Sequence, residues 1–343
     1  MTYSNTAASS NVGVVLGLMT WGREGTEGAR VHTFKQCEEM LDIFQKHGHK
    51  ELDTAFVYTS HTSEQMLGEI DWKKRGLIVD TKLYPSKTSD GTPITHSRAD
   101  LRKFLDMQLE ACKTTCFDMW YLHAPDRKTD FAKTFAAVDE LYREGKFKRF
   151  GISNYMSWEV AHIVELCDKN GWIKPTAYQG IYNALHRNVE PELFPCLRKF
   201  GISFYEFNPL AGGLFTGRYS GVDMQVENGS RFDPATGQGQ NYRKRYFNDR
   251  YFEALALIEP IAKKHDLTMC GVALRWINHH SLLKRNHGDQ ILIGASSHRH
   301  LEDNLIDLEK GPLPEEVVNI LDEAWEIFRP VATKVNSVGE TCI

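Results

Sequence analysis

The feature that most constrains the fold of this chain is a regular alternation of short apolar runs with longer segments that repeat apolar residues near the helical period. We predict that the apolar runs are β-strands, at about 12–18, 51–58, 77–83, 118–126, 149–153, 175–182, 202–207 and 290–294. We predict helices at about 34–44, 63–70, 101–112, 131–143, 158–169, 191–200, 247–264, 270–279, 301–308 and 315–328. This alternation is typical of a parallel sheet with right-handed crossovers, and eight units fit an α/β fold of the (β/α)8 TIM-barrel type.

A doubly wound open sheet is the alternative architecture. Such a sheet usually carries Gly-x-Gly-x-x-Gly after its first strand, whereas the turn here reads Leu-Met-Thr-Trp-Gly-Arg-Glu-Gly. No linker divides the units, so we predict a single barrel domain over residues 12–330, with extra C-terminal helices. The polar stretch 220–245 after the seventh strand is long enough to indicate a functional loop. We expect residues 1–11 to be a disordered arm and 331–343 to be a C-terminal tail.

Composition excludes several classes of function. The formal net charge is −4, and no basic block or basic amphipathic stretch indicates a nucleic-acid or membrane-surface partner. The sequence shows no secretory signal and no apolar run long enough to span a bilayer. The seven cysteines form no Cys-x-x-Cys pair, which favours reduced thiols and a cytoplasmic location. We expect no metal site, because no histidine pair has the spacing and acidic partner that zinc requires.

Ionisable residues lie near the ends of three successive predicted strands. Asp53 and Tyr58 lie in the run 51–58, Lys82 ends the next run, and His123 lies in the third. Parallel α/β folds place active sites at that edge of the sheet. We expect Asp53 to offset the charge of Lys82, and Lys82 to lower the pKa of the Tyr58 hydroxyl. With His123 binding the carbonyl oxygen, this arrangement suits carbonyl reduction, in which a proton reaches oxygen while a hydride reaches carbon.

Each of these residues also has a purely structural interpretation. Asp53 and Lys82 could form a structural ion pair, Tyr58 could be a loop aromatic, and His123 could be a hydrogen-bonded core residue. Their joint position at strand ends is what favours an active site.

The later strand ends suit a phosphate-bearing ligand. The loop 208–219 contains three glycines, which allow close backbone approach, and it also contains Arg218. After the eighth strand, Ser296 and Ser297 can cap a helix whose first turn contains Arg299. A cation is unfavourable at a helix N-terminus, so an anionic ligand would explain Arg299, although an ordinary capped helix with an exposed arginine remains an alternative.

Several long strings make the chain resemble an aldo-keto reductase from about residue 17 to 328. These are Asp-Thr-Ala-Phe-Val-Tyr, Leu-His-Ala-Pro-Asp, Gly-Ile-Ser-Asn-Tyr, Tyr-Gln-Gly-Ile-Tyr-Asn and Asn-Pro-Leu-Ala-Gly-Gly-Leu-Phe-Thr-Gly-Arg-Tyr. The strings Glu-Leu-Phe-Pro-Cys-Leu-Arg-Lys-Phe-Gly and Ala-Leu-Arg-Trp-Ile-Asn-His-His are similar to the aflatoxin-aldehyde reductase branch. The resemblance implies NADPH/NADP+ as cofactor and a small-molecule carbonyl substrate, such as an aldehyde, a dialdehyde, a semialdehyde or an activated ketone. It also raises the possibility of a homodimer.

The resemblance also implies a role for each site residue. Tyr58 would be the general acid, Lys82 and Asp53 its tuning partners, and His123 the residue that orients the carbonyl. The nicotinamide would lie near Ser153, Asn154 and Gln179 and stack on Tyr205 or a neighbour. The full set implied for the cofactor is Met19, Ser153, Asn154, Gln179, Tyr205, Asn208, Leu210, Gly212, Arg218, Arg231, Ser296, Ser297, Arg299, His300 and Asn304. Tyr242 and Arg245, with His123, would approach the substrate.

Two departures from the branch and two other functions bear on this interpretation. Glu206 stands where the branch usually has a small residue, and the tail lacks the branch's terminal arginine. A nicotinamide-sensing subunit of an ion channel, with binding rather than turnover, is an alternative function on the same scaffold. A phosphate-sugar isomerase barrel is a third, and it predicts no nicotinamide binding.

Overall fold

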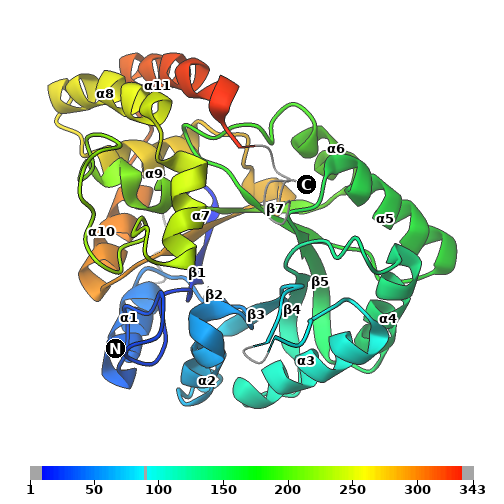
Figure 1. Cartoon of the computed structure of the whole chain (residues 1–343). Helices are drawn as coiled ribbons and strands as arrows, with labels where there is room; N and C mark the ends of the chain where they lie inside the picture. The colour runs from blue at the N-terminus through cyan, green and yellow to red at the C-terminus, as the bar shows by residue number, and fades with distance from the viewer. Residues whose placement is uncertain (1–9, 89–90, 334–343) are drawn as a thin grey trace, which may run out of the picture.

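Eight parallel strands close into a barrel in the computed structural model, which describes residues 10–88 and 91–333. The strands are β1 (Gly13–Gly17), β2 (Glu51–Asp53), β3 (Ile78–Leu83), β4 (Phe117–Leu122), β5 (Phe147–Ser153), β6 (Ala177–Ile181), β7 (Ser203–Phe207) and β8 (Gln290–Gly294). Each strand pairs with its neighbours in sequence, and β8 pairs with β1 to close the ring (Figure 1). The predicted (β/α)8 barrel is therefore confirmed over the doubly wound sheet.

Helices surround the barrel, most of them on its outside (Figure 1). They are α1 (Phe34–Lys46), α2 (Thr62–Gly68), α3 (Arg98–Ala111), α4 (Phe131–Arg143), α5 (Ser157–Asn170), α6 (Leu193–Phe200), α7 (Gly237–Tyr246), α8 (Asp249–Lys264), α9 (Met269–His279), α10 (His298–Glu309) and α11 (Glu315–Phe328). Helix α1 shows why such segments fold as helices. Thr33 and Gln36 form a capping box, and Cys37, Leu41 and Phe44 are buried on one face of α1.

The wall of the barrel separates two environments, as β7 illustrates. Phe204 packs against Phe194 of α6, so it faces outward into the core between strands and helices. Tyr205 and Phe207 belong instead to the inner cluster with Val15, Met119 and others. Because side chains alternate along a strand, Glu206 shares the outward face of Phe204.

Two sequence predictions about element boundaries are wrong. The run 51–58 is a strand only through Asp53, after which the backbone turns. Tyr58 opens a 3₁₀ helix, η1 (Tyr58–His61), in which Thr59 and Ser60 adopt left-handed backbone conformations. Tyr58 is therefore placed by a tight turn beside the strand end.

The long connection after β7 is also not all loop, because it contains α7. Thr236 caps this helix by accepting a hydrogen bond from the Gly239 N–H, and Tyr242 and Tyr246, four residues apart, bury its inner face. A second segment, η2 (Ala211–Thr216), follows β7 directly.

The ends of the domain lie slightly outside the predicted limits. Asn278 holds Ser10 and Asn11 through hydrogen bonds of 3.1 and 3.0 Å, so these two residues belong to the folded domain and not to the arm. At the other end, the Thr333 carbonyl accepts a hydrogen bond from His186 at 2.8 Å. Residues 1–9 and 334–343, which include most of the predicted arm and tail, lie outside the described residues. Within the part of the chain that the structure describes, no helix has the length and apolar character to cross a membrane.

Candidate active site

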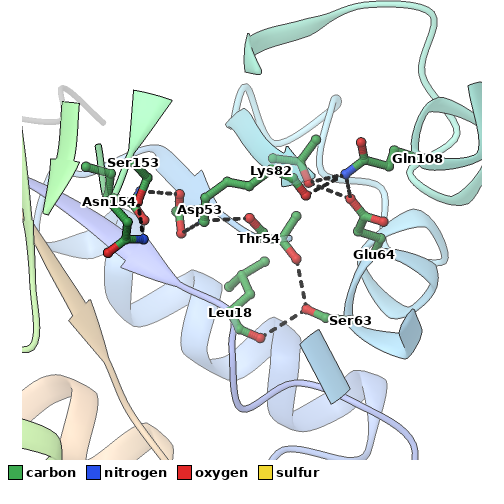
Figure 2. A network of polar contacts seen from close by, with 11 residues as sticks. Leu18, Asp53, Thr54, Ser63, Glu64, Lys82, Gln108, Ser153 and Asn154 are labelled. Atoms are coloured by element: carbon green, nitrogen blue, oxygen red, sulfur yellow. Dashed lines mark hydrogen bonds and ion pairs between the residues drawn. The ribbon is translucent and has the colours of Figure 1, made fainter. Parts of the chain in front are cut away.

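A buried ion pair lies at the carboxyl end of the barrel. Lys82 Nζ donates to the carboxylate of Asp53 and to the Thr54 carbonyl, the latter at 2.7 Å (Figure 2). Gln179 Nε2 donates to the other Asp53 oxygen at 2.8 Å from across the barrel. Asp53 is 3% exposed and Lys82 is fully buried. Burial raises the pKa of Asp53 and lowers the pKa of Lys82, and the ion pair opposes both shifts.

Tyr58 and His123 lie next to this pair. The Tyr58 ring centroid is 5.1 Å from Lys82 Nζ and 5.9 Å from the His123 ring, which meets it edge-on. Tyr84 flanks His123 on a second side at 5.3 Å. The structure thus brings together all four residues that the sequence predicted, from β2, β3, η1 and the turn after β4.

The electrostatics of Tyr58 differ from the sequence prediction. Burial, followed by the charge of Asp53, raises the pKa of the Tyr58 hydroxyl well above its usual value. Arg231 is a cation that lowers this pKa, whereas the Lys82 ammonium donates its hydrogen bonds to Asp53 and Thr54. Burial, followed by the charge of Lys82, lowers the pKa of His123 well below its usual value. The site therefore combines a protonated phenol with a neutral imidazole at pH 7.

Three predicted nicotinamide contacts surround the same point. Asn154 Nδ2 donates to the His123 carbonyl and to Ser153 Oγ, both at 2.9 Å. Asn154 adopts a left-handed conformation at φ 63°, which turns its side chain back toward the mouth. Gln179 already donates to Asp53, so its amide oxygen remains as an acceptor. These residues are close to the ion pair.

A second group of predicted residues meets above the mouth. Tyr242 donates to Asn208 Oδ1 at 3.1 Å and accepts from Arg231 at 3.0 Å. Arg231 also reaches Met19 Sδ at 3.4 Å, so the connections after β1 and β7 touch. A Cβ on Gly212 would lie 2.6 Å from Tyr242 Cδ1, so only glycine fits there.

The same surface contains Arg245, whose guanidinium lies 5.7 Å from the ring centroid of Tyr242. Arg245 lies on α7, within the segment that we predicted to be a loop. The loop 208–217 also has left-handed backbone conformations at Asn208, Ala211, Gly212, Gly213 and Gly217. Turns of this kind can present backbone N–H groups to an anion such as a diphosphate, although Ala211, Gly213 and Gly217 donate theirs to carbonyls within the loop.

The remaining predicted cofactor residues lie after β8 and on the outer part of the glycine loop. Ser297 caps α10 by accepting from the His300 N–H at 3.2 Å, and Ser296 Oγ pairs with His300 Nδ1 at 3.0 Å. Arg299 is exposed and Asn304 is buried. Leu210 is half-buried, and the exposed Arg218 lies 3.4 Å from Glu227. Among the described residues, none of these predicted cofactor residues contacts the Lys82–Asp53 ion pair.

Tyr205 is the one predicted cofactor residue that lies in the wrong place. Its hydroxyl donates to Glu51 and accepts from Arg149, each at 3.1 Å, and it pairs with Gln290 at the amino-terminal end of β8. Phe207, two residues later on the same inward face, reaches the carboxyl end and is half-buried. The alternation of side chains along β7 could have predicted this difference, because the last inward-facing aromatic residue of the strand lies nearest the mouth of the barrel.

No group of three or more metal-ligating side chains occurs within residues 10–88 and 91–333.

Comparisons with known proteins show what the chain is similar to. The family model described as the aldo/keto reductase family matches residues 13–326. An aldo-keto reductase of Pseudocercospora fijiensis (strain CIRAD86) is 50% identical over 290 residues, covering 84% of this chain and 97% of that protein. Aflatoxin B1 aldehyde reductase member 2 of Homo sapiens is 40% identical over 324 residues, covering 92% and 87%. A solved glycerol dehydrogenase, AKR11B4 from Gluconobacter oxydans, shares the fold with a TM-score of 0.71 at 21% identity, covering 92% of each chain.

Proposed function

From the premise that this chain belongs to the aldo/keto reductase family, and is an oxidoreductase that acts on carbonyl groups, we propose that it reduces aldehydes to alcohols with NADPH, using Tyr58 as the proton donor. The substrates would include dialdehydes or semialdehydes, and activated ketones. The observation that carries the proposal is the position of the Tyr58 phenol, which lies next to the buried Lys82–Asp53 pair and to the His123 ring.

The proton chemistry follows from these neighbours. The raised pKa keeps the Tyr58 hydroxyl protonated at neutral pH, so that it can donate to a carbonyl oxygen. The phenolate left behind is stabilised by the charges of Lys82 and Arg231. His123, neutral because its pKa is lowered, hydrogen-bonds the same oxygen without adding a competing charge. When bound, the reduced nicotinamide supplies the hydride.

Residues around the mouth fit such a dinucleotide. We propose that Ser153, Asn154 and Gln179 bind the carboxamide and that Phe207, in place of Tyr205, stacks on the ring. The diphosphate would lie along 208–217, where the cradle formed by Gly212 leaves no space for a side chain. Next to this loop, Arg231 bonds to Met19 and to Tyr242, and Tyr242 bonds to Asn208 at the start of the loop.

The preference for NADPH over NADH is proposed from the first turn of α10. That turn contains His298, Arg299 and His300 and no acidic residue. Positive charge at a helix N-terminus is unfavourable unless an anion lies nearby. Asp303 lies 3.8 Å from Arg299 and Glu39 lies 3.9 Å from His298, both long for an ion pair, and a 2′-phosphate would add an anionic partner. Ser296 and Ser297 add hydroxyl donors at the same place.

We also propose a cytoplasmic location and a homodimer as the working state. The described cysteines are free, and burial raises the pKa of Cys37 and Cys167 to about 12, so these thiols stay protonated. Such unreactive thiols suit a reducing compartment. Sedimentation velocity measures the oligomeric state directly.

The test of the proposed function is the variant Tyr58→Phe. We expect kcat for aldehyde reduction to fall by about 10² to 10⁴, the range for loss of a general acid. The Kd for NADPH, measured by quenching of tryptophan fluorescence, should stay within about twofold, because the ring is retained. Tyr142→Phe, which removes a phenol from the surface of α4, is the matched control. If Tyr58→Phe kept turnover within tenfold of the unmodified protein, the assignment of the acid would be wrong.

A further inference from the structure

A cavity of about 380 Å³ lies between the connection after β1 and the connection after β7. Its lining includes Glu27, Arg30, His32, Ser230 and Gln238. The two connections are held together at its edge, because the Glu27 carboxylate accepts the Gln238 N–H at 2.9 Å and so caps the start of α7. None of the lining residues belongs to the cofactor or substrate set described above.

Arg30 and Glu27 are the charged residues of opposite sign in this lining, but they form no ion pair with each other. Arg30 Nη1 donates to the Ala29 carbonyl at 2.9 Å, but no carboxylate of the described chain lies within 4 Å of its guanidinium. The charged group that acts on Arg30 is another cation, Arg231, which together with burial lowers the pKa of Arg30. Arg231 also lacks a carboxylate partner among the described residues and bonds to Met19 and Tyr242. Two half-buried guanidinium groups thus lie near each other without neutralisation, which is unfavourable unless an anion is present.

The backbone around Arg30 leaves room for a ligand. The Arg30 guanidinium lies against Gly229, where a Cβ would be 3.8 Å from Nη2. Gly229 has a φ of 67°, which favours glycine at this position. The next residue, Ser230, has a buried hydroxyl for which no hydrogen-bond partner exists among the described residues. A buried hydroxyl without a partner is costly, by about 1–3 kcal/mol, and rotation of the Ser230 side chain toward the cavity would let it donate to an oxyanion there.

We propose that Arg30 and Ser230, with Arg231 behind them, form an anion-binding subsite for a carboxylate or phosphate group. This inference rests on the proposed function, since it concerns what else the same mouth binds. The oxyanion has two sources that share this chemistry. One is the diphosphate of the dinucleotide, and the other is an anionic group at the far end of the carbonyl substrate. Guanidinium groups form charge-assisted, paired hydrogen bonds with either.

Two measurements on Arg30→Gln separate these sources. The first is the Kd for NADPH by tryptophan fluorescence, which does not depend on turnover. The second is the ratio of kcat/KM for straight-chain aldehydes with a terminal carboxylate to that for methyl-terminated aldehydes of the same length. A Kd at least fivefold weaker with an unchanged ratio assigns the subsite to the cofactor. A ratio at least fivefold lower with an unchanged Kd assigns it to the substrate.

Two further variants make the test selective. Ser230→Ala should shift the same quantity as Arg30→Gln, by a smaller factor, because a neutral hydroxyl donates a weaker bond. Arg23→Gln is the control, since Arg23 lies exposed on the same connection and bonds to Gln65 outside the cavity. If Kd and ratio both stayed within twofold in Arg30→Gln and Ser230→Ala, the subsite would be refuted. Failure of the unmodified protein to reduce the methyl-terminated aldehydes would contradict the proposed function, and the Kd would then decide the subsite alone.

Discussion

Two buried carboxyl groups on opposite faces of the barrel wall differ in their hydrogen-bond partners. Asp53 faces inward from β2 and receives hydrogen bonds from Lys82 and Gln179. Glu206 lies on the outward face of β7, is fully buried, and has no partner for either oxygen among the described residues. Burial alone raises the pKa of Glu206 well above its usual value. The inner carboxylate is held by a cation, whereas the outer carboxyl group keeps its proton.

A third carboxyl group, Glu64 on α2, is intermediate between these two in its hydrogen-bond partners. It is buried like the others, but its hydrogen bonds come from the neutral groups of Thr81 and Gln108, the latter at 2.7 Å (Figure 2). Burial raises its pKa to about 7, and the hydrogen bonds from Thr81 and Gln108, followed by the charge of Lys82, limit the rise. Burial is similar in all three, so the charge of the partner decides whether each group is ionised at neutral pH. Only the group that contacts a cation belongs to the predicted catalytic set.

Removing the cation should have the largest effect. We expect Lys82→Met to lower kcat by at least about 10², and to destabilise the fold by about 3–5 kcal/mol at pH 7, because Asp53 is left buried without its counter-charge. Urea unfolding and steady-state kinetics measure the two losses.

The double variant Asp53→Asn/Lys82→Met provides the control for this prediction. It should recover most of the lost stability, since no uncompensated charge remains, yet recover none of the turnover. If the double variant were no more stable than Lys82→Met alone, the ion pair would not be the source of the loss.

For Glu206, the comparison predicts a pH dependence of stability with a definite sign. The folded state binds a proton that the unfolded chain releases near pH 4.5, so the stability of the protein falls as pH rises from there toward the raised pKa of Glu206. Glu206→Gln removes this loss, at roughly 1 kcal/mol or slightly more for each pH unit. Urea unfolding between pH 5.5 and 8 should show the advantage of the variant growing with pH.

Glu38→Gln, which changes an exposed carboxylate on α1, should show no such growth. An advantage of Glu206→Gln that stayed constant or shrank with pH would mean that Glu206 is already ionised in the folded protein.

Much of the fold was predictable from sequence because it depends on repeating local patterns. Alternating strands and helices specified the barrel, and strand ends brought Asp53, Lys82 and His123 together. α7 was missed because its pattern is carried by Tyr242 and Tyr246 within a polar segment. Packing against the barrel mouth, which is a tertiary effect, stabilises it.

The properties that sequence did not reveal depend on which face a side chain occupies and on what it touches there. Tyr205 and Phe207 share a face but lie at different depths in the barrel, and only the register with β8 distinguishes them. The pKa of Tyr58 depends on its burial and on the charges of Asp53 and Arg231, which no spacing encodes. The sequence showed that Glu206 departs from the pattern of the aflatoxin-aldehyde reductase branch, but only the packed structure shows that its carboxyl oxygens have no hydrogen-bond partner among the described residues.

Glu64→Gln should produce the smallest effect, and it tests whether the intermediate case also communicates with the inner pair. Gln108 links Glu64 to the Lys82 carbonyl at 3.1 Å, and the ionised Glu64 raises the pKa of Lys82 (Figure 2). Without that charge, the pKa of Lys82 should fall further, so the alkaline limb of the kcat/KM profile should move to lower pH by less than about one unit. Turnover below pH 6 should be the same in the two proteins, because Glu64 is then protonated and as uncharged as the glutamine that replaces it. Profiles from pH 5.5 to 10, with Glu38→Gln as control, measure this shift, and a limb that stayed in place or moved upward would show that Glu64 does not influence Lys82.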